Sequence, residues 1–124
     1  MALSARTALV LFAFLTGAGC QTEPPADVPP MLGDAQSGAR IIARIECGVC
    51  HVIPGVRGAR GMLGPSLDGF ARRAYIAGVV PNRPSVLVQW VRDAPSIAPE
   101  TLMPELPLSD REAHDVAAYL YTLR

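Results

Sequence analysis

From residue 33 onward, the hydrophobic positions recur at the spacing of helices and not at that of strands. Asp34 can cap the first helix at its N-terminus. The positions that then share one helix face are Gly38, Ile41, Ile42 and Ile45. This spacing predicts an N-terminal helix that leads directly into Cys47.

Two more helices are predicted further along the chain. Pro84 can open the first of them, which runs to Asp93 with Val86, Leu87, Trp90 and Val91 on one side. Ser109 and Glu112 form a capping-box pattern before the second, whose apolar face holds Ala113, Val116, Ala117, Leu120 and Leu123. Between the helices Gly and Pro are frequent, and no alternating apolar run is long enough to predict a sheet. We therefore expect an all-α domain over residues 33–124.

The first apolar run of the chain, residues 7–19, predicts an export signal over residues 1–19. It follows Arg6 and is shorter than the roughly 20 residues that a membrane-spanning helix needs. The run ends at Cys20 after Gly-Ala-Gly, which resembles the lipobox of bacterial lipoproteins, where the cysteine is acylated and becomes the mature N-terminus. Ordinary cleavage near the same point and an uncleaved anchor are the alternatives. Residues 20–32 are rich in proline and predict an extended spacer.

Composition and charge narrow the class of function. Hydrophobic residues make up 50% of the 124-residue chain but aromatic residues only 6%, so a core of about 90 residues lacks large fillers and is marginal alone. The 11 basic and 11 acidic residues cancel, which gives no support to nucleic-acid binding. From His51 to Arg92 there are six arginines and one acid, whereas residues 100–115 hold five acids and one arginine. This order predicts a charge dipole.

Cys47, Cys50 and His51 form the pattern Cys-x-x-Cys-His. The two thiols lie one helical turn apart, which matches the two vinyl groups of haem, and the imidazole that follows stands beneath the iron. A zinc ribbon is poorly supplied, because the only further Cys and His are Cys20 and His114. A thioredoxin-like dithiol lacks its strand-helix context, and a disulfide between residues three apart is geometrically tight. We therefore predict one covalently attached haem c, which also fills the core.

Four segments resemble class I cytochromes c, in the order in which that family has them. They are GDAQSGARIIARIECGVCH at residues 33–51, GPSL at 64–67, TLMP at 101–104 and DVAAYLYTL at 115–123. Within the family, the chain is most similar to the cytochrome c domains attached to some bacterial cytochrome oxidases. The resemblance implies a cytochrome c fold, with three main helices and loops wrapped around the haem.

The same resemblance implies roles for several residues. Pro65 is expected to pack on His51 and to accept a hydrogen bond from its imidazole through the backbone oxygen, with Leu67 in the same haem-contacting loop. Trp90 is expected near the haem and Met103, although a plain core aromatic is the alternative. Arg73, with Arg72 as its rival, is expected to neutralise a haem propionate.

Met103 is the predicted second axial ligand. It lies far from His51 in sequence, between Leu102 and Pro104, in an irregular segment that can carry a thioether to the far face of the haem. Met31 lies in the spacer, and Met62 is only eleven residues after His51, on the histidine side of the ring. His114 falls in the first turns of the last helix, where a solvated histidine is expected. Tyr119 is expected to pack against Gly38.

Ligation by His and Met leaves the iron no open position, so the predicted function is electron transfer and not catalysis. Expected partners are a donor such as a cytochrome bc1-type complex or a dehydrogenase and an acceptor such as a terminal oxidase. The expected location is the periplasmic side of a bacterial membrane, with a lipid at Cys20 as anchor. A permanently docked oxidase or dehydrogenase subunit, or a haem peroxidase or gas sensor with a labile methionine, are the alternatives. Arg57 and Arg60 are expected to orient an acidic partner; contact with haem propionates and solvent is the alternative.

Overall fold

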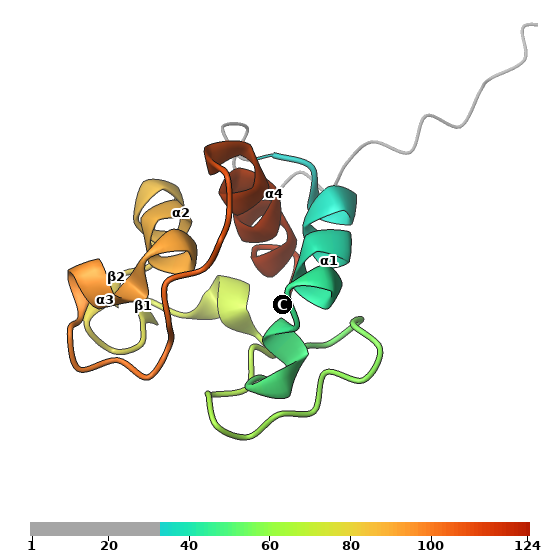
Figure 1. Ribbon diagram of the computed structural model, residues 1–124, viewed down its shortest axis with the longest axis horizontal. Coiled ribbons are helices and arrows are strands. Elements are labelled where there is room, and N and C mark those ends of the chain that lie inside the picture. Colours follow the sequence, from blue (N-terminus) through green and yellow to red (C-terminus); the bar gives the residue numbers. More distant parts are fainter. Residues whose placement is uncertain (1–32) are drawn as a thin grey trace, which may run out of the picture.

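The computed structural model describes residues 33–124 (Figure 1). The predicted export signal, the lipidation site at Cys20 and the spacer lie outside the described residues. In chain order the elements are α1 (Ala35–Arg44), the short 3-10 helices η1 (Cys47–Val49) and η2 (Phe70–Arg72), the strands β1 (Tyr75–Ile76) and β2 (Val80–Pro81), and the helices α2 (Pro84–Arg92), α3 (Ala94–Ile97) and α4 (Asp110–Leu120). The three predicted helices correspond to α1, α2 and α4.

The contact between α1 and α4 organises the fold. A side chain at Gly38 would place its Cβ only 2.0 Å from the backbone oxygen of Asp115 and 3.0 Å from Cβ of Tyr119. Glycine therefore allows the two helices to approach this closely. The carboxylate of Asp115 is buried and accepts a hydrogen bond from the N–H of Asp34 at 2.7 Å. Helices α1 and α4 are thus in direct contact at Gly38, and Tyr119 packs there as predicted.

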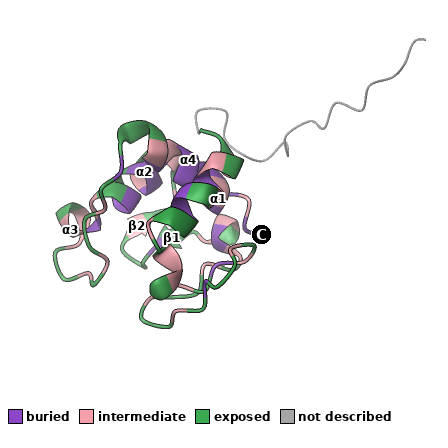
Figure 2. Cartoon of the chain, turned by 45° about the vertical axis from the view of Figure 1, so that its right-hand side comes forward, coloured by how far each residue is buried: buried purple, intermediate pink, exposed green. Residues whose placement is uncertain are grey.

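The apolar core lies where α1, α2 and α4 face one another. Figure 2 shows buried positions on these helices, with exposed positions on their outer faces. The α2 helix contributes Leu87, Val88, Trp90 and Val91, and fully buried alanines lie at 94, 113, 117 and 118. Small side chains thus take up much of the core, in agreement with the low aromatic content.

The N-termini of α1 and α4 have the caps that the sequence predicted. Asp34 caps α1 by accepting a hydrogen bond from the N–H of Ser37. Ser109 and Glu112 form the full capping box of α4. No helix in the described part of the chain is both long and apolar enough to cross a membrane.

The short helix α3 and the hairpin formed by β1 and β2 were not predicted. The four-residue helix α3 begins after Asp93, whose carboxylate accepts a hydrogen bond from the N–H of Ser96 at 3.1 Å. Strands β1 and β2 form an antiparallel pair around a turn in which Ala77 and Gly78 have φ of 50° and 74°. Because each strand has two residues, no alternating run marks it in the sequence. The expectation of a domain without a sheet missed this hairpin.

Candidate functional site

Cys47 and Cys50 lie on the turn that directly follows α1. Helix α1 ends at Arg44, and Glu46 takes a left-handed conformation with φ of 60°, which redirects the chain before Cys47. The N–H groups of Cys50 and His51 donate to the backbone oxygen of Cys47 at 3.2 and 3.0 Å. Both cysteines are free thiols on this single turn. Burial raises the pKa of Cys47 to about 11, so its thiol is protonated at neutral pH.

The imidazole of His51 is held from two sides by the GPSL loop. Its Nδ1–H donates to the backbone oxygen of Pro65 at 2.7 Å, which is the hydrogen bond that the family resemblance implies. A Cβ at Gly64 would lie 2.3 Å from Cε1 of the ring, so the bare backbone of Gly64 lies against the imidazole. Gly64 is itself fixed by a hydrogen bond from its N–H to the oxygen of Cys50 at 2.8 Å. With the proton on Nδ1, Nε2 retains the lone pair that a metal needs.

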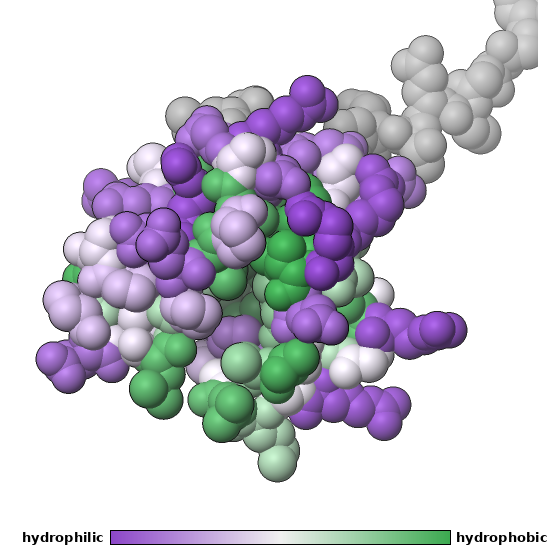
Figure 3. Space-filling model, in the orientation of Figure 1, coloured by the Kyte–Doolittle hydropathy of each residue, from purple (hydrophilic) through white to green (hydrophobic). Residues whose placement is uncertain are grey.

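These residues fit a haem c. Thioether bonds require free thiols on one turn, and axial ligation requires an imidazole with one free nitrogen; the chain provides both. Figure 3 shows a recess in the middle of the face seen there, with apolar side chains around it. No group of three His, Cys, Asp or Glu residues within residues 33–124 could hold a metal ion on its own. The donor set therefore suits haem iron and not a zinc ribbon.

Met103 occupies the long irregular segment between α3 and α4. Its side chain is half-buried and packs against the core, whereas the preceding Leu102 is 91% exposed. The other methionine of the described residues, Met62, is 89% exposed. His114 contacts Asp110, with its Nδ1 at 2.8 Å from the backbone oxygen. Of the ligand candidates that the structure describes, Met103 is the one whose side chain packs against the core.

The remaining predicted site residues have these positions. Trp90 is buried in the core, and Leu67, Cys47 and Met103 are partly buried against the same core. The guanidinium of Arg73 donates to the backbone oxygens of Ser66 and Asp68 and lies 5.7 Å from the ring centre of Phe70. Arg73 is thus next to the GPSL loop, and its role toward a propionate stays a prediction.

Three residues that hold the site were not singled out from the sequence. Gly64 lies against the ring of His51, and Thr101 accepts a hydrogen bond from the N–H of Met103 at 3.2 Å. Asn82 donates to the backbone oxygens of Phe70 and Arg73 at 3.2 and 3.0 Å and accepts from the hydroxyl of Tyr121. The position of Thr101 two residues before Met103 was a usable signal, because Thr often hydrogen-bonds the N–H two residues on. Nothing in the sequence pattern indicated Asn82.

The chain is 28% identical over 113 residues to cytochrome c oxidase subunit 2 of Alkalihalophilus pseudofirmus. This match covers 90% of the chain but 31% of the oxidase subunit, so the chain spans less than a third of that relative's length. No family model matches the chain.

Solved structures that are similar to this one include the following three. SoxXA from P. pantotrophus superposes with a TM-score of 0.60 at 22% identity, over 79% of this chain and 87% of the other. The c-type cytochrome SorU of Sinorhizobium meliloti gives 0.51 at 25% identity, over 72% and 88%. Cytochrome c2 of Rhodobacter sphaeroides gives 0.53 at 21% identity, over 73% and 96%. The chain therefore has the fold of the c-type cytochromes, and haem c is the cofactor that Cys47 and Cys50 are positioned to attach.

Proposed function

We propose that the protein is a mono-haem c-type cytochrome that passes single electrons between protein partners outside the cytoplasm. The observation that carries this proposal is the His51 site, where two free thiols on one turn precede an imidazole whose Nδ1–H is bound to Pro65. Bound haem supplies an iron that changes by one electron between its ferric and ferrous states.

Each residue of the site then has a defined task. Cys47 and Cys50 would hold the haem by thioether bonds, and His51 would bind the iron through Nε2 while Pro65 fixes the ring orientation. Met103 would supply the second ligand, and its thioether would favour the ferrous state and raise the potential relative to a second histidine. With both residues bound, the iron would have no open position for a substrate. The protein is therefore proposed to be a carrier and not an enzyme.

The axial ligation is tested with Met103→Ala, and Met62→Ala is the matched control. We expect Met103→Ala to remove the weak sulfur-to-iron charge-transfer band of the oxidised protein and to lower the midpoint potential. Met62→Ala should leave both unchanged, because Met62 is exposed. Loss of the band in Met62→Ala but not in Met103→Ala would show that the ligand assignment is wrong.

Covalent attachment is tested separately with the Cys47→Ser/Cys50→Ser double variant. This variant should carry no haem after denaturation and should fail to fold, because the haem replaces much of the core. Intact-mass measurement of the denatured protein reports the result. A variant chain that still has the mass of the haem would refute attachment at these cysteines.

A docking surface next to the attachment turn supports electron exchange with another protein. Val49, Val52, Met62 and Leu63 are exposed apolar residues, and we call them the apolar patch. The segments that carry them are in backbone contact: Gly61, next to Met62, lies against the oxygen of Val49, and Val52 pairs with Arg60. Arg57 and Arg60 are exposed on the same loop. This surface suits a redox protein whose apolar contact area is bordered by carboxylates.

A second candidate function is that of a fixed subunit of an oxidase. The match to cytochrome c oxidase subunit 2 favours it, because that relative is a subunit of a larger assembly by its name. Gentle extraction followed by size-exclusion chromatography with detection of haem absorbance separates the two. A carrier elutes alone, whereas a fixed subunit elutes together with the oxidase.

The location is proposed from the sequence of the N-terminal part alone. A lipid at Cys20 would hold the protein on the periplasmic side of a bacterial membrane, with residues 20–32 as the spacer. Cys20→Ala should move the protein from the detergent-extracted membrane to the soluble periplasmic fraction, with an unchanged haem spectrum. Continued membrane partition would contradict the lipid anchor.

A further inference from the structure

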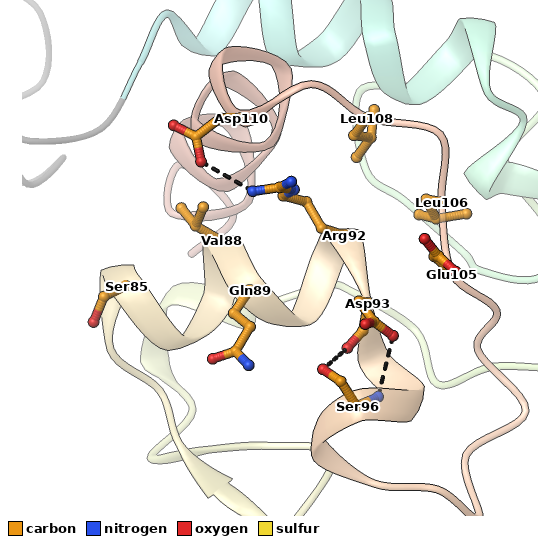
Figure 4. A pocket seen from close by; sticks show the side chains of 10 residues that line it. All are labelled: Ser85, Val88, Gln89, Arg92, Asp93, Ser96, Glu105, Leu106, Leu108 and Asp110. Atoms are coloured by element: carbon orange, nitrogen blue, oxygen red, sulfur yellow. Dashed lines mark hydrogen bonds and ion pairs between the residues drawn. The ribbon is translucent and has the colours of Figure 1, made fainter.

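The segment that carries Met103 is attached to the rest of the protein at few points. Between α3 and α4 it has no regular secondary structure. Its second half is held at the C-terminal end of α2, where the N–H of Leu106 donates to the oxygen of Arg92 at 2.8 Å and Glu105 pairs with Asp93. The guanidinium of Arg92 also reaches Asp110 at 3.1 Å (Figure 4).

Apolar packing holds the second half of this segment, because Leu108 is buried in the core and Leu106 packs against it. A hollow of about 400 Å³ lies beside this half, between α2, α3 and residues 105–110 (Figure 4). Residues 101–104 do not line the hollow, and the backbone next to Met103 is held by hydrogen bonds within its own turn.

Met103 is held locally by Thr101. Oγ1 of Thr101 accepts a hydrogen bond from the N–H of Met103 at 3.2 Å, and the N–H of Thr101 donates to the oxygen of Ala98 at 2.9 Å. The turn exposes Leu102 and leaves Met103 half-buried against the core. Pro104 follows without an N–H, so it adds no donor to the turn and restricts the backbone of Met103. The Thr101 hydroxyl is therefore the one side chain seen to fix the N–H of Met103 in the described residues.

We propose that Thr101 is a positioning residue for Met103: its hydroxyl oxygen holds the turn that keeps the thioether on the iron. This inference rests on the proposed function, in which Met103 is the axial ligand. Without the acceptor, the N–H of Met103 loses a partly buried partner and the turn opens more readily. Thr101 thus determines how easily an external ligand displaces the methionine.

The test is the binding of imidazole to the oxidised holoprotein, followed by the loss of the sulfur-to-iron charge-transfer band. Imidazole competes with Met103, so its apparent affinity reports how often the methionine is released. We expect Thr101→Val to bind imidazole about fivefold more tightly than the unmodified protein, which corresponds to about 1 kcal/mol. Thr101→Ser keeps the oxygen and should restore the original affinity. Amide hydrogen exchange at Met103 should be faster in Thr101→Val alone.

Ser109→Ala is the matched control, because it also removes a hydroxyl that accepts a backbone N–H, but in the cap of α4. It should lower overall stability and leave the affinity for imidazole unchanged. Equal imidazole affinity in Thr101→Val and the unmodified protein, or an equal increase in Ser109→Ala, overturns the proposal. Should Thr101→Val not fold with haem, Thr101→Ala takes the same measurement. Met103→Ala tests the ligand assignment separately from the role of Thr101. If this variant keeps the charge-transfer band and binds imidazole no more tightly, the assignment of Met103 as the ligand fails.

Discussion

At the scale of single residues, one glycine decides how the imidazole of His51 is held. Gly64 lies between the Cys50 oxygen, to which its N–H donates, and Pro65, whose oxygen accepts from the imidazole. Its lack of a side chain leaves room for the ring, since a Cβ would come within 2.3 Å of Cε1 and 2.6 Å of Nδ1. The imidazole and the backbone of Gly64 cannot move apart easily, because the ring is hydrogen-bonded to Pro65 and the N–H of Gly64 to Cys50.

Gly64→Ala should therefore displace the imidazole. We expect a changed haem absorption spectrum and a free energy of unfolding lowered by about 1–3 kcal/mol through overpacking. Gly58→Ala is the control: nothing lies within 4 Å of its Cβ, but its φ of +81° makes the substitution cost about 1 kcal/mol in backbone strain. Only Gly64→Ala should alter the spectrum. Absorption spectroscopy and denaturant unfolding measure the two effects.

At the scale of elements, the N-termini of α1 and α4 depend on ionised carboxylates. Asp34 accepts from the N–H of Ser37, and the carboxylate of Glu112 accepts from the N–H of Ser109 and contacts Arg44 at 2.5 Å. The backbone hydrogen bond from Ser37 lowers the pKa of Asp34 below its usual 3.8. The backbone hydrogen bond from Ser109, followed by its hydroxyl, lowers the pKa of Glu112 below its usual 4.5. The N-termini of α1 and α4 therefore favour the ionised form of these two carboxylates.

Acid should weaken these caps. A folded-state pKa below the unfolded value means that the stabilisation is complete above the unfolded value and is lost as the pH falls through the folded value. The melting temperature of the holoprotein should therefore decrease from about pH 4.5 downward. The glutamine of Glu112→Gln can still accept a hydrogen bond but does not titrate. The melting temperature of this variant should therefore decrease less on acidification. A constant difference in melting temperature between the two proteins from pH 6 to pH 3 would contradict the role of Glu112.

The sequence predicted the elements that pack against one another and missed those that depend on local turns. The spacing of residues in the sequence indicates the apolar faces of α1, α2 and α4 and the two caps. The strands of the hairpin have two residues each and α3 has four. Segments this short do not show a recognisable hydrophobic period. Cys47, Cys50 and His51 are adjacent in sequence and could be found, but the contact of Gly64 with the ring joins residues 13 positions apart and requires the fold.

At the scale of the whole molecule, the fold reduces the charge separation seen along the chain. Arg92 pairs with Asp110 and Arg44 with Glu112. Two of the charges counted in the predicted dipole, Arg92 and Asp110, are thus paired with each other. The guanidinium groups of Arg57 and Arg60 form no ion pair or hydrogen bond with the rest of residues 33–124, and they remain available beside the apolar patch.

Replacing both exposed arginines should slow association with an acidic partner. We expect Arg57→Gln/Arg60→Gln to reduce the second-order rate of electron transfer to an isolated oxidase several-fold at low ionic strength, and to flatten its dependence on salt. At ionic strength near 1 M, where the screening length is about 3 Å, the two proteins should react equally fast. Arg111→Gln, on the acidic segment, is the control. Stopped-flow kinetics at several salt concentrations measure this dependence. An unaltered salt slope would eliminate the docking role.

The contrast between the two described methionines also bears on oxidative damage. Peroxide and related oxidants convert a thioether to a sulfoxide at a rate that follows its exposure. Met62 is almost fully exposed, whereas Met103 is half-buried and, as the proposed iron ligand, would have its sulfur lone pair engaged. Of these two, Met62 should gain the first oxygen atom, and peptide mass spectrometry after mild peroxide treatment will locate it. A preparation oxidised in this way becomes heavier and more polar beside the attachment turn while its redox potential is still that of the intact protein.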